Sequence, residues 1–157
     1  MTHKLESFAR YRITSQETRP IRHAVLRQDG SMAETIFSGD DDPDAFHAGV
    51  YDNGAIVAVA SVFREAPHGE MDVDAWRLRG MAVLPGFQNR GYGKELLQAC
   101  IAYVKDAEGS HLWCNARSAA RNFYESAGFT VEGNRFYLPQ GGNHYFMRLR
   151  LRETKLS

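Results

Sequence analysis

The stretch FQNRGYGKELL, residues 87–97, places two glycines and two cations directly before an apolar helical pattern. Apolar residues recur with the helical period as far as Val104, which predicts a helix from about Gly91 to Ala107. The N-terminus of a helix binds anions through its free N–H groups and the positive end of its dipole. Glycine lets an anion come close because it has no Cβ. The stretch therefore predicts either a phosphate-binding loop or a plain tight turn that begins a helix.

The two commonest phosphate-binding patterns do not match this loop. A nucleoside triphosphate P-loop needs Ser or Thr after Gly-Lys, whereas Glu95 follows Gly93-Lys94 here. The dinucleotide fingerprint needs a third glycine where this chain has Leu96. The loop alone therefore does not identify its anion.

Strand and helix patterns alternate on both sides of the loop. Asn53-Gly54 separates two apolar runs and predicts a β-hairpin. The other expected elements are a strand at Phe8–Ile13, a helix at Glu17–Gln28, a turn-rich segment at Gly30–Asp44, a strand at Trp76–Leu84, a short strand HLWC, a helix that ends at Gly128 and two closing strands. This order predicts an α/β or α+β layer fold.

The composition excludes several classes of protein. The chain has 157 residues, and 19 basic side chains balance 19 acidic ones, so it lacks the basic excess of a nucleic-acid-binding protein. Its longest apolar stretch, Ala55–Phe63, is about half of a membrane span. The first residues lack an apolar signal-peptide core, which favours the cytoplasm. Two cysteines make no disulfide framework, and the histidines lack paired metal spacing, so we expect no metal.

Two further stretches resemble a known family when they are combined with the loop. QNRGYG resembles the Q/R-x-x-G-x-G/A signature of the GNAT acetyltransferase superfamily, whose members bind the pyrophosphate of acetyl-coenzyme A there. GMAVLPGF is similar to the fourth strand of that family, and NFYESAGF, Asn122–Phe129, to a helix ending of the family. The resemblance covers roughly residues 76–129. It implies one GNAT-like domain over residues 1–157, with a mixed, mostly antiparallel sheet of about six or seven strands flanked by helices.

The resemblance also implies a cosubstrate and the residues that bind it. Acetyl-coenzyme A would donate its acetyl group directly to a primary amine, without an acyl-enzyme. The backbone around Met81, Ala82 and Val83 would hold the pantetheine arm and polarise the carbonyl. The pyrophosphate would lie on Gln88, Asn89, Arg90, Gly91, Tyr92, Gly93 and Lys94. Asn122 is a further expected contact, and so is Asn115, because this chain has Arg117 where relatives carry an asparagine.

Two side chains are candidates for moving protons. Tyr124, within the second motif, is the expected general acid, because a phenol with a pKa near 10 can protonate a departing thiolate. The alternative for Tyr124 is a core tyrosine. Relatives often have a glutamate base in the fourth strand, but Arg77 and Arg79 stand there. His144 is the expected base and His47 a second candidate, with an exposed strand histidine as the alternative for His144.

Three other features have a structural and a functional interpretation. The acidic segment Gly39–Asp44 is expected to be solvated, and attraction of a cationic substrate is the alternative. The alternating arginines of RLRLR, residues 148–152, are expected to line a solvent face. Cys114 ends a strand, either in the core or facing a cleft.

The sequence leaves the acceptor open between a small molecule and a peptide or protein amine. The resemblance implies acceptor contacts from Arg22–Asp44 and Phe136–Tyr145, and relatives that dimerise through terminal strands make a homodimer an expectation. A catalytically inactive acyl-coenzyme A sensor is the main alternative function. A nucleotide-phosphate binder is a weaker one.

Overall fold

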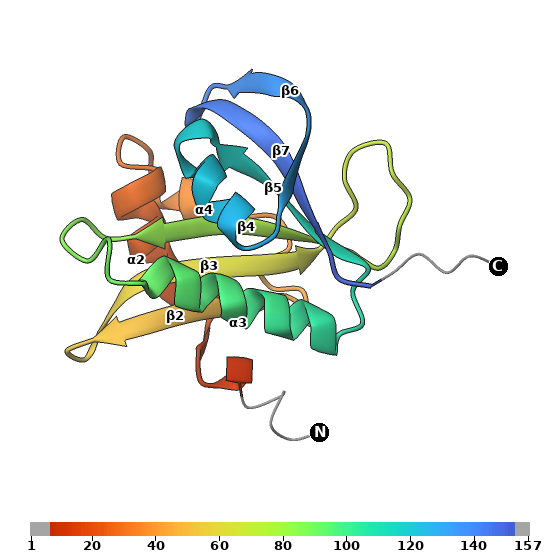
Figure 1. The fold of residues 1–157 in the computed structure, drawn as a ribbon. Helices are drawn as coiled ribbons and strands as arrows, with labels where there is room; N and C mark the ends of the chain where they lie inside the picture. Colours follow the sequence, from red (N-terminus) through yellow and green to blue (C-terminus); the bar gives the residue numbers. More distant parts are fainter. Residues whose placement is uncertain (1–6, 153–157) are drawn as a thin grey trace. The chain divides into compact units, whose positions relative to one another are not determined.

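One mixed sheet, in the order β1-β2-β3-β4-β5-β7-β6, organises the protein, of which the computed structural model describes residues 7–152 (Figure 1). The strands are β1 (Arg12–Ile13), β2 (Phe46–Asp52), β3 (Ala55–Arg64), β4 (Ala75–Val83), β5 (His111–Arg117), β6 (Thr130–Leu138) and β7 (Gly142–Arg150). The neighbours β4 and β5 are parallel, whereas β1–β2, β2–β3, β5–β7 and β6–β7 are antiparallel. The expected fold class is thus confirmed.

The described residues divide into two compact units. The first unit comprises the residues up to Phe63 together with Leu78–Ala107, and the second comprises Arg64–Arg77 together with the residues from Glu108 onward. Strand β4 contributes to both. The helical elements of the first unit are α2 (Ser15–Leu26), η1 (Met32–Thr35) and α3 (Tyr92–Asp106), and those of the second are η2 (Ser118–Ala120) and α4 (Arg121–Ser126).

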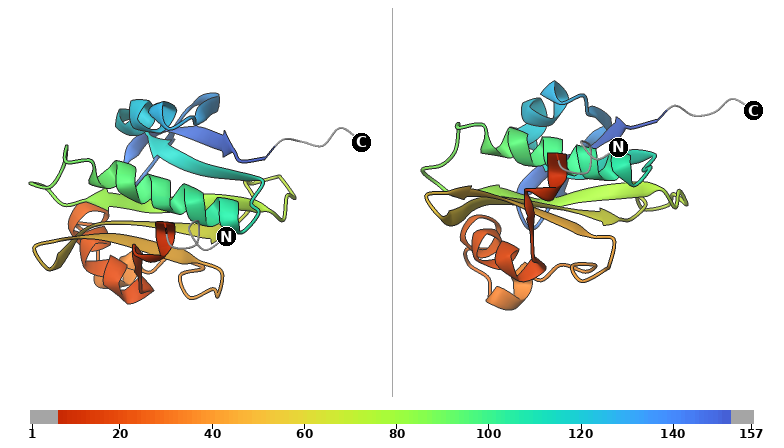
Figure 2. Two further views of the ribbon diagram at one scale, coloured as in Figure 1. Left: turned by 60° about the horizontal axis from the view of Figure 1, so that its bottom comes forward. Right: turned by 90° about the horizontal axis from the view of Figure 1, so that it is seen from below.

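In the first unit, α2 and α3 cover opposite faces of the β2–β3–β4 sheet (Figure 2). The predicted hairpin turn lies between β2 and β3, where Asn53 and Gly54 both have left-handed φ angles of 53° and 85°. Two such residues in succession are what a two-residue hairpin turn requires. Helix α3 buries the apolar face that its sequence predicted, which includes Leu96, Leu97 and Cys100.

The strand predicted at Phe8–Ile13 is wrong for most of its length, because only Arg12–Ile13 joins the sheet. The Tyr11 N–H donates to the Phe8 carbonyl at 3.0 Å, which closes a turn there. The Phe8 ring packs edge-on against Phe46 and Tyr103, at centroid distances of 5.7 and 5.2 Å. The buried Phe8 side chain in this turn thus gives the sequence the alternation of apolar and polar residues that is typical of a strand.

Helix α2 begins two residues before its predicted start, because a capping box fixes it. The Thr14 hydroxyl accepts from the Glu17 N–H at 3.1 Å, and the Glu17 carboxylate accepts from the Thr14 N–H at 2.8 Å. These bonds satisfy backbone donors that would otherwise lack a partner at the helix end.

The acidic segment Gly39–Asp44 is not simply solvated, because Asp40 lies in a buried ion pair. Its carboxylate accepts from both terminal nitrogens of Arg22, at 2.8 and 3.0 Å. The two side chains are 2% and 0% exposed. Arg22 also donates to the Thr35 carbonyl and to the Ser61 hydroxyl. This pair fixes the segment between α2 and β2 to the core.

The second unit contains the antiparallel strands β5, β7 and β6 and the short helix α4. Arg148 on β7 was expected to face solvent, but it is only 8% exposed. Its guanidinium donates twice to Glu70 and twice to Glu132, at 2.7 to 2.9 Å. Its Nη1, which also donates to Glu70, lies 3.1 Å from Nε2 of His111. The prediction was wrong for Arg148, because two carboxylates from other segments cover it, whereas Arg150 and Arg152 are exposed as predicted.

The ion pair between Arg148 and Glu70 also fixes the loop before β4. Its acidic side chains alternate with apolar ones, and each acid has a partner within the second unit: Glu70 with Arg148, Asp72 with Ser110, and Asp74 with Arg64 and Arg152. The intervening Met71 and Val73 point outward and are 94% and 77% exposed. The acids therefore hold this loop, although its apolar side chains contribute nothing to a core.

Candidate active site

The candidate cofactor strand is the end of β4, where Gly80 interrupts the regular backbone. Its φ is +71°, and a Cβ there would lie 2.9 Å from the Phe37 ring. Only glycine adopts this conformation without strain. Directly after it come Met81 and Val83, both half-buried, and the buried Ala82.

The loop after β4 turns twice before the helix begins. The Phe87 N–H donates to the Leu84 carbonyl at 3.0 Å, and the Gln88 amide donates to the Val83 carbonyl at 3.3 Å. Asn89 has a left-handed φ of 63°. Gly91, the N-cap of α3, has a φ of +85°, and no atom lies within 4 Å of the position that its Cβ would occupy. The space in front of Gly91 is therefore open.

The first turn of α3 begins with backbone donors that have no acceptor within the helix. The first bond of α3 runs from the Glu95 N–H to the Gly91 carbonyl, at 3.0 Å. The N–H groups of Tyr92, Gly93 and Lys94 precede that bond, and such groups have no acceptor within a helix. The side chains of Arg90 and Lys94 are exposed beside them. This end of α3 therefore combines N–H donors, the helix dipole and two cations, which is the chemistry of an anion site.

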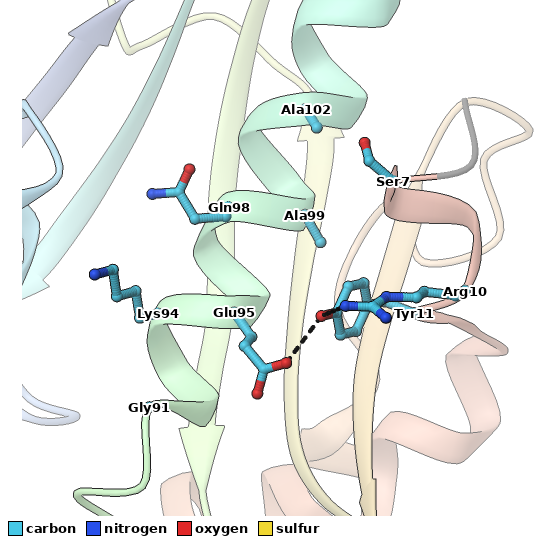
Figure 3. A pocket seen from close by; sticks show the side chains of 9 residues that line it. All are labelled: Ser7, Arg10, Tyr11, Gly91, Lys94, Glu95, Gln98, Ala99 and Ala102. Atoms are coloured by element: carbon cyan, nitrogen blue, oxygen red, sulfur yellow. Dashed lines mark hydrogen bonds between the residues drawn. The ribbon is translucent and has the colours of Figure 1, made fainter. Parts of the chain in front are cut away.

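The acid in the first turn of α3 has its own partner. The Glu95 carboxylate accepts from the Tyr11 hydroxyl at 2.9 Å, and Arg10 donates to the same hydroxyl (Figure 3). Burial raises the pKa of Tyr11, and the hydrogen bond to Glu95 raises it further. An open cavity of about 500 Å³ lies here, lined by Ser7, Arg10, Tyr11, Gly91, Lys94, Glu95, Gln98, Ala99 and Ala102.

One residue of this neighbourhood was missed by the sequence reasoning. Asp52, at the end of β2, accepts from the Tyr92 hydroxyl at 2.6 Å and from Arg90 at 3.4 Å. An acid before Asn-Gly has the appearance of an ordinary turn residue. The contact between Asp52 and the loop could have been suggested only by placing the end of the predicted hairpin next to the predicted phosphate-binding loop.

Tyr124 lies on α4, in the second unit, and is 6% exposed. Its ring packs edge-on against Phe123 and Phe129, at centroid distances of 5.0 and 5.4 Å. Its carbonyl accepts the Phe129 N–H beyond the left-handed Gly128, which ends the helix as predicted. Asn122 is exposed on the same short helix.

His144 lies on β7 of the second unit and is 5% exposed, so the alternative of an exposed strand histidine is wrong. Its Nδ1 lies 2.7 Å from the Gly142 carbonyl. A carbonyl only accepts, so Nδ1 carries the proton, and in the neutral ring Nε2 has the free lone pair. The ring stacks on Phe136 at 5.9 Å. This tautomer is the one in which Nε2 can accept a proton.

The second candidate base, His47, does not suit that role. Its Nδ1 lies 2.7 Å from the Ser61 hydroxyl, and its Nε2 lies 2.9 Å from the Asp40 carbonyl. Burial lowers the pKa of His47. Both ring nitrogens are engaged in the buried network around Arg22, which makes the residue structural.

Two further positions on β5 complete the set of predicted residues. Asn115 is half-buried and pairs in register with Phe146. Cys114 is 3% exposed, and burial raises its pKa to about 12, so it is a core residue and not a nucleophile.

The structure thus groups the predicted residues by unit. Residues 81–83 and 88–94 belong to the first unit, whereas Asn115, Asn122, Tyr124 and His144 belong to the second. Within residues 7–152, no three His, Cys, Asp or Glu side chains converge as a metal site. Over the same range, no helix is long and apolar enough to cross a membrane.

Comparisons with known proteins identify the family. The model of the acetyltransferase (GNAT) family matches residues 9–129. The uncharacterized N-acetyltransferase YitI of Bacillus subtilis is 30% identical over 143 residues, which is 91% of this chain and 96% of that protein. A putative N-acetyltransferase from Lactobacillus plantarum shares the fold, with a TM-score of 0.71, 18% identity and coverage of 88% of this chain and 91% of that one. An aminoglycoside 6′-N-acetyltransferase, solved with coenzyme A, gives a TM-score of 0.69 at 11% identity, over 90% and 92% of the two chains. The chain therefore belongs to the GNAT family of N-acetyltransferases, whose members use acetyl-coenzyme A.

Proposed function

We propose that the protein transfers the acetyl group of acetyl-coenzyme A directly to a primary amine of a small molecule or a peptide. The observation that carries this proposal is the N-terminus of α3. Gly91 has a left-handed backbone there, with open space before it, and Arg90 and Lys94 stand beside it. A side chain at position 91 would occupy the space that a pyrophosphate needs, so the residues present fit the group.

Coenzyme A would lie along two consecutive segments of the first unit. The pyrophosphate would accept from the N–H groups of Tyr92, Gly93 and Lys94 and meet the side chains of Arg90 and Asn89. The folded-back Gln88 would support the loop through its bond to the Val83 carbonyl. The backbone of Met81, Ala82 and Val83 would hold the pantetheine arm. Asn115 and Asn122 are the proposed contacts from the second unit.

Bound acetyl-coenzyme A supplies the thioester that the amine attacks. The contribution of the protein is mainly to position the two reactants, which alone lowers the barrier by several kcal/mol. Tyr124 donates its phenol proton to the departing sulfur. His144 accepts a proton from the attacking amine at Nε2, directly or through one water, because its Nδ1–H is held by Gly142.

The acceptor would contact two segments that expose apolar side chains. Between α2 and β2, Met32 and Ile36 are 49% and 52% exposed. On the last hairpin, Tyr137 is 70% exposed. Two similar proteins suggest the amines to try first. One is a ribosomal protein bS18-alanine N-acetyltransferase of Haemophilus ducreyi, 36% identical over 75 residues (44% of this chain and 52% of that protein), and the other is the aminoglycoside enzyme.

The test is the release of free coenzyme A from acetyl-coenzyme A over a panel of amines. The panel contains alanyl peptides, aminoglycosides, amino acids and polyamines. Tyr124→Phe and His144→Gln should each slow release by about 100-fold or more, as expected when a general acid or base is removed. Tyr51→Phe is the matched control, because it removes an exposed phenol of the first unit.

Each result has a defined meaning. If Tyr124→Phe releases coenzyme A as fast as wild type at every pH, the assignment of Tyr124 is wrong. If acetyl-coenzyme A binds but no amine supports release, the inactive sensor is the better description. If ATP competes with coenzyme A, the loop is a general phosphate site.

A further inference from the structure

An acid on the β2–β3 hairpin contacts the candidate coenzyme A loop. Asp52 is the last residue of β2, and its Oδ2 accepts from the Tyr92 hydroxyl at 2.6 Å and from Nη1 of Arg90 at 3.4 Å. Both donors belong to the QNRGYG motif. These residues are 38 and 40 positions from Asp52 in the sequence, so the fold brings them together.

The hairpin end of this contact is rigid. Asp52 pairs in register with Ala55 across the two-residue turn. Asn53 and Gly54 hold left-handed φ angles in that turn. Few backbone rotations therefore separate the carboxylate from the β2–β3 ladder, which makes Asp52 a fixed acceptor.

The loop end of the contact needs such an acceptor. Tyr92 is the first residue of α3 and directly follows Gly91, which is exposed and has no atom within 4 Å of the position of its missing Cβ. No side chain packing fixes the backbone at Gly91, and glycine is the residue that rotates most freely. The hydroxyl of Tyr92 thus supplies a fixed point one residue after the flexible one.

The two bonds to Asp52 differ in strength. The phenol donates to a charged acceptor at 2.6 Å, and charge-assisted bonds of this length are strong. The hydrogen bond to Asp52 is also the largest cause that raises the pKa of Tyr92, so the phenol keeps its proton. The Arg90 side chain is 52% exposed at a longer distance, and exposed ion pairs contribute little. Its guanidinium also lies over the Phe87 ring at 5.0 Å.

We propose that Asp52 is a positioning residue for coenzyme A. It holds the first turn of α3 in the anion-binding arrangement through the Tyr92 hydroxyl, while Arg90 exchanges its weak contact with Asp52 for the pyrophosphate. This inference rests on the proposed function, because it assumes that coenzyme A is the anion of the loop. Asp52 itself touches no reacting atom.

The test is the dissociation constant of coenzyme A, measured by calorimetry on the full chain. Tyr92→Phe and Asp52→Ala each remove the positioning bond, and each should weaken binding by about 5- to 20-fold. The double variant should be no weaker than the worse single variant, because both remove the same bond. Asp52→Asn keeps an oxygen acceptor without the charge, so its affinity should lie between those of wild type and Asp52→Ala.

One control separates positioning from a general loss of structure. Tyr51→Phe removes the phenol next to Asp52, which donates to Glu17 at 3.4 Å. It should leave coenzyme A binding unchanged. The urea midpoint of Tyr92→Phe should equal that of Tyr51→Phe within error.

The outcomes distinguish this inference from the proposed function. If wild type does not bind coenzyme A, the proposed function fails. If wild type binds it and Tyr92→Phe binds equally well, only the positioning role of Asp52 is overturned. Additive losses in the double variant, or an equal loss in Asp52→Asn and Asp52→Ala, also overturn it. A loss in Tyr92→Phe, together with a smaller loss in Asp52→Asn than in Asp52→Ala, supports it.

Discussion

Replacing Asp40 with asparagine tests the buried ion pair that holds the segment between α2 and β2. The variant keeps the volume of the side chain but removes the charge opposite Arg22, whose side chain is 0% exposed. Removing one partner of a buried pair costs about 3–5 kcal/mol, because the remaining charge is uncompensated. Thr35 and Ser61 still accept from Arg22, so we expect the lower part of that range, about 3 kcal/mol.

The expected loss is large compared with the stability of a domain, which is about 5–15 kcal/mol. For a chain of this size, each kcal/mol shifts the melting temperature by about 2–4 °C, so Asp40→Asn should melt about 6–12 °C below wild type. Urea unfolding followed by circular dichroism gives the free energy, and differential scanning calorimetry gives the melting temperature.

Two variants make this test specific. Asp41→Asn changes the neighbouring acid, which is exposed and accepts from Ser15 at 3.1 Å, and it should cost less than about 1 kcal/mol. The double variant Arg22→Met with Asp40→Leu removes both charges and should recover most of the loss. A cost below about 1 kcal/mol for Asp40→Asn would refute the reasoning, since Arg22 would then be stable without its partner.

Three further predictions concern single side chains. The pKa of His47 is lowered, so the native state binds fewer protons than the unfolded chain, and the free energy of unfolding should fall as the pH drops below about 6.5. Urea titrations across this range should show a smaller fall for His47→Gln, and an unchanged fall would contradict the assignment. Cys100 and Cys114 have pKa values raised to about 12, so a disulfide reagent at pH 8 should react with neither until urea unfolds the chain, and rapid reaction of the native protein would show that one is accessible. Arg148→Lys cannot fork to both Glu70 and Glu132 and should cost about 1–2 kcal/mol in urea unfolding, whereas wild-type stability would show that one contact suffices.

Sequence patterns predicted the elements that are determined by interactions between residues close together in the chain. Asn53-Gly54 predicted its hairpin because both residues tolerate left-handed backbone angles. The apolar period up to Val104 predicted α3 because burial on one helix face leaves a visible repeat. The apolar pattern of α2 predicts a start at Glu17, whereas the Thr14–Glu17 capping box, which is visible in the sequence, begins the helix two residues earlier.

The wrong predictions concern side chains whose partners are distant in the sequence. Asp40 has the appearance of a solvated acid, and only the approach of Arg22 from α2 makes it a core residue. Arg148 fits an exposed strand arginine until Glu70 and Glu132 cover it. Asp52 shows the same limit for the candidate site. The motif predicted the loop from one continuous stretch, but nothing within that stretch indicates which residue of another hairpin touches it.

The loop of alternating acidic and apolar residues before β4 determines which methionine is oxidised first. Met71 is 94% exposed, so its thioether is open to peroxide, whereas Met147 is fully buried. Because the flanking acids hold the loop, a polar sulfoxide at position 71 disturbs no packing, while the same modification at position 147 would place an oxygen inside the core. Oxidation should therefore convert the exposed Met71 side chain before the buried Met147 and leave the fold intact.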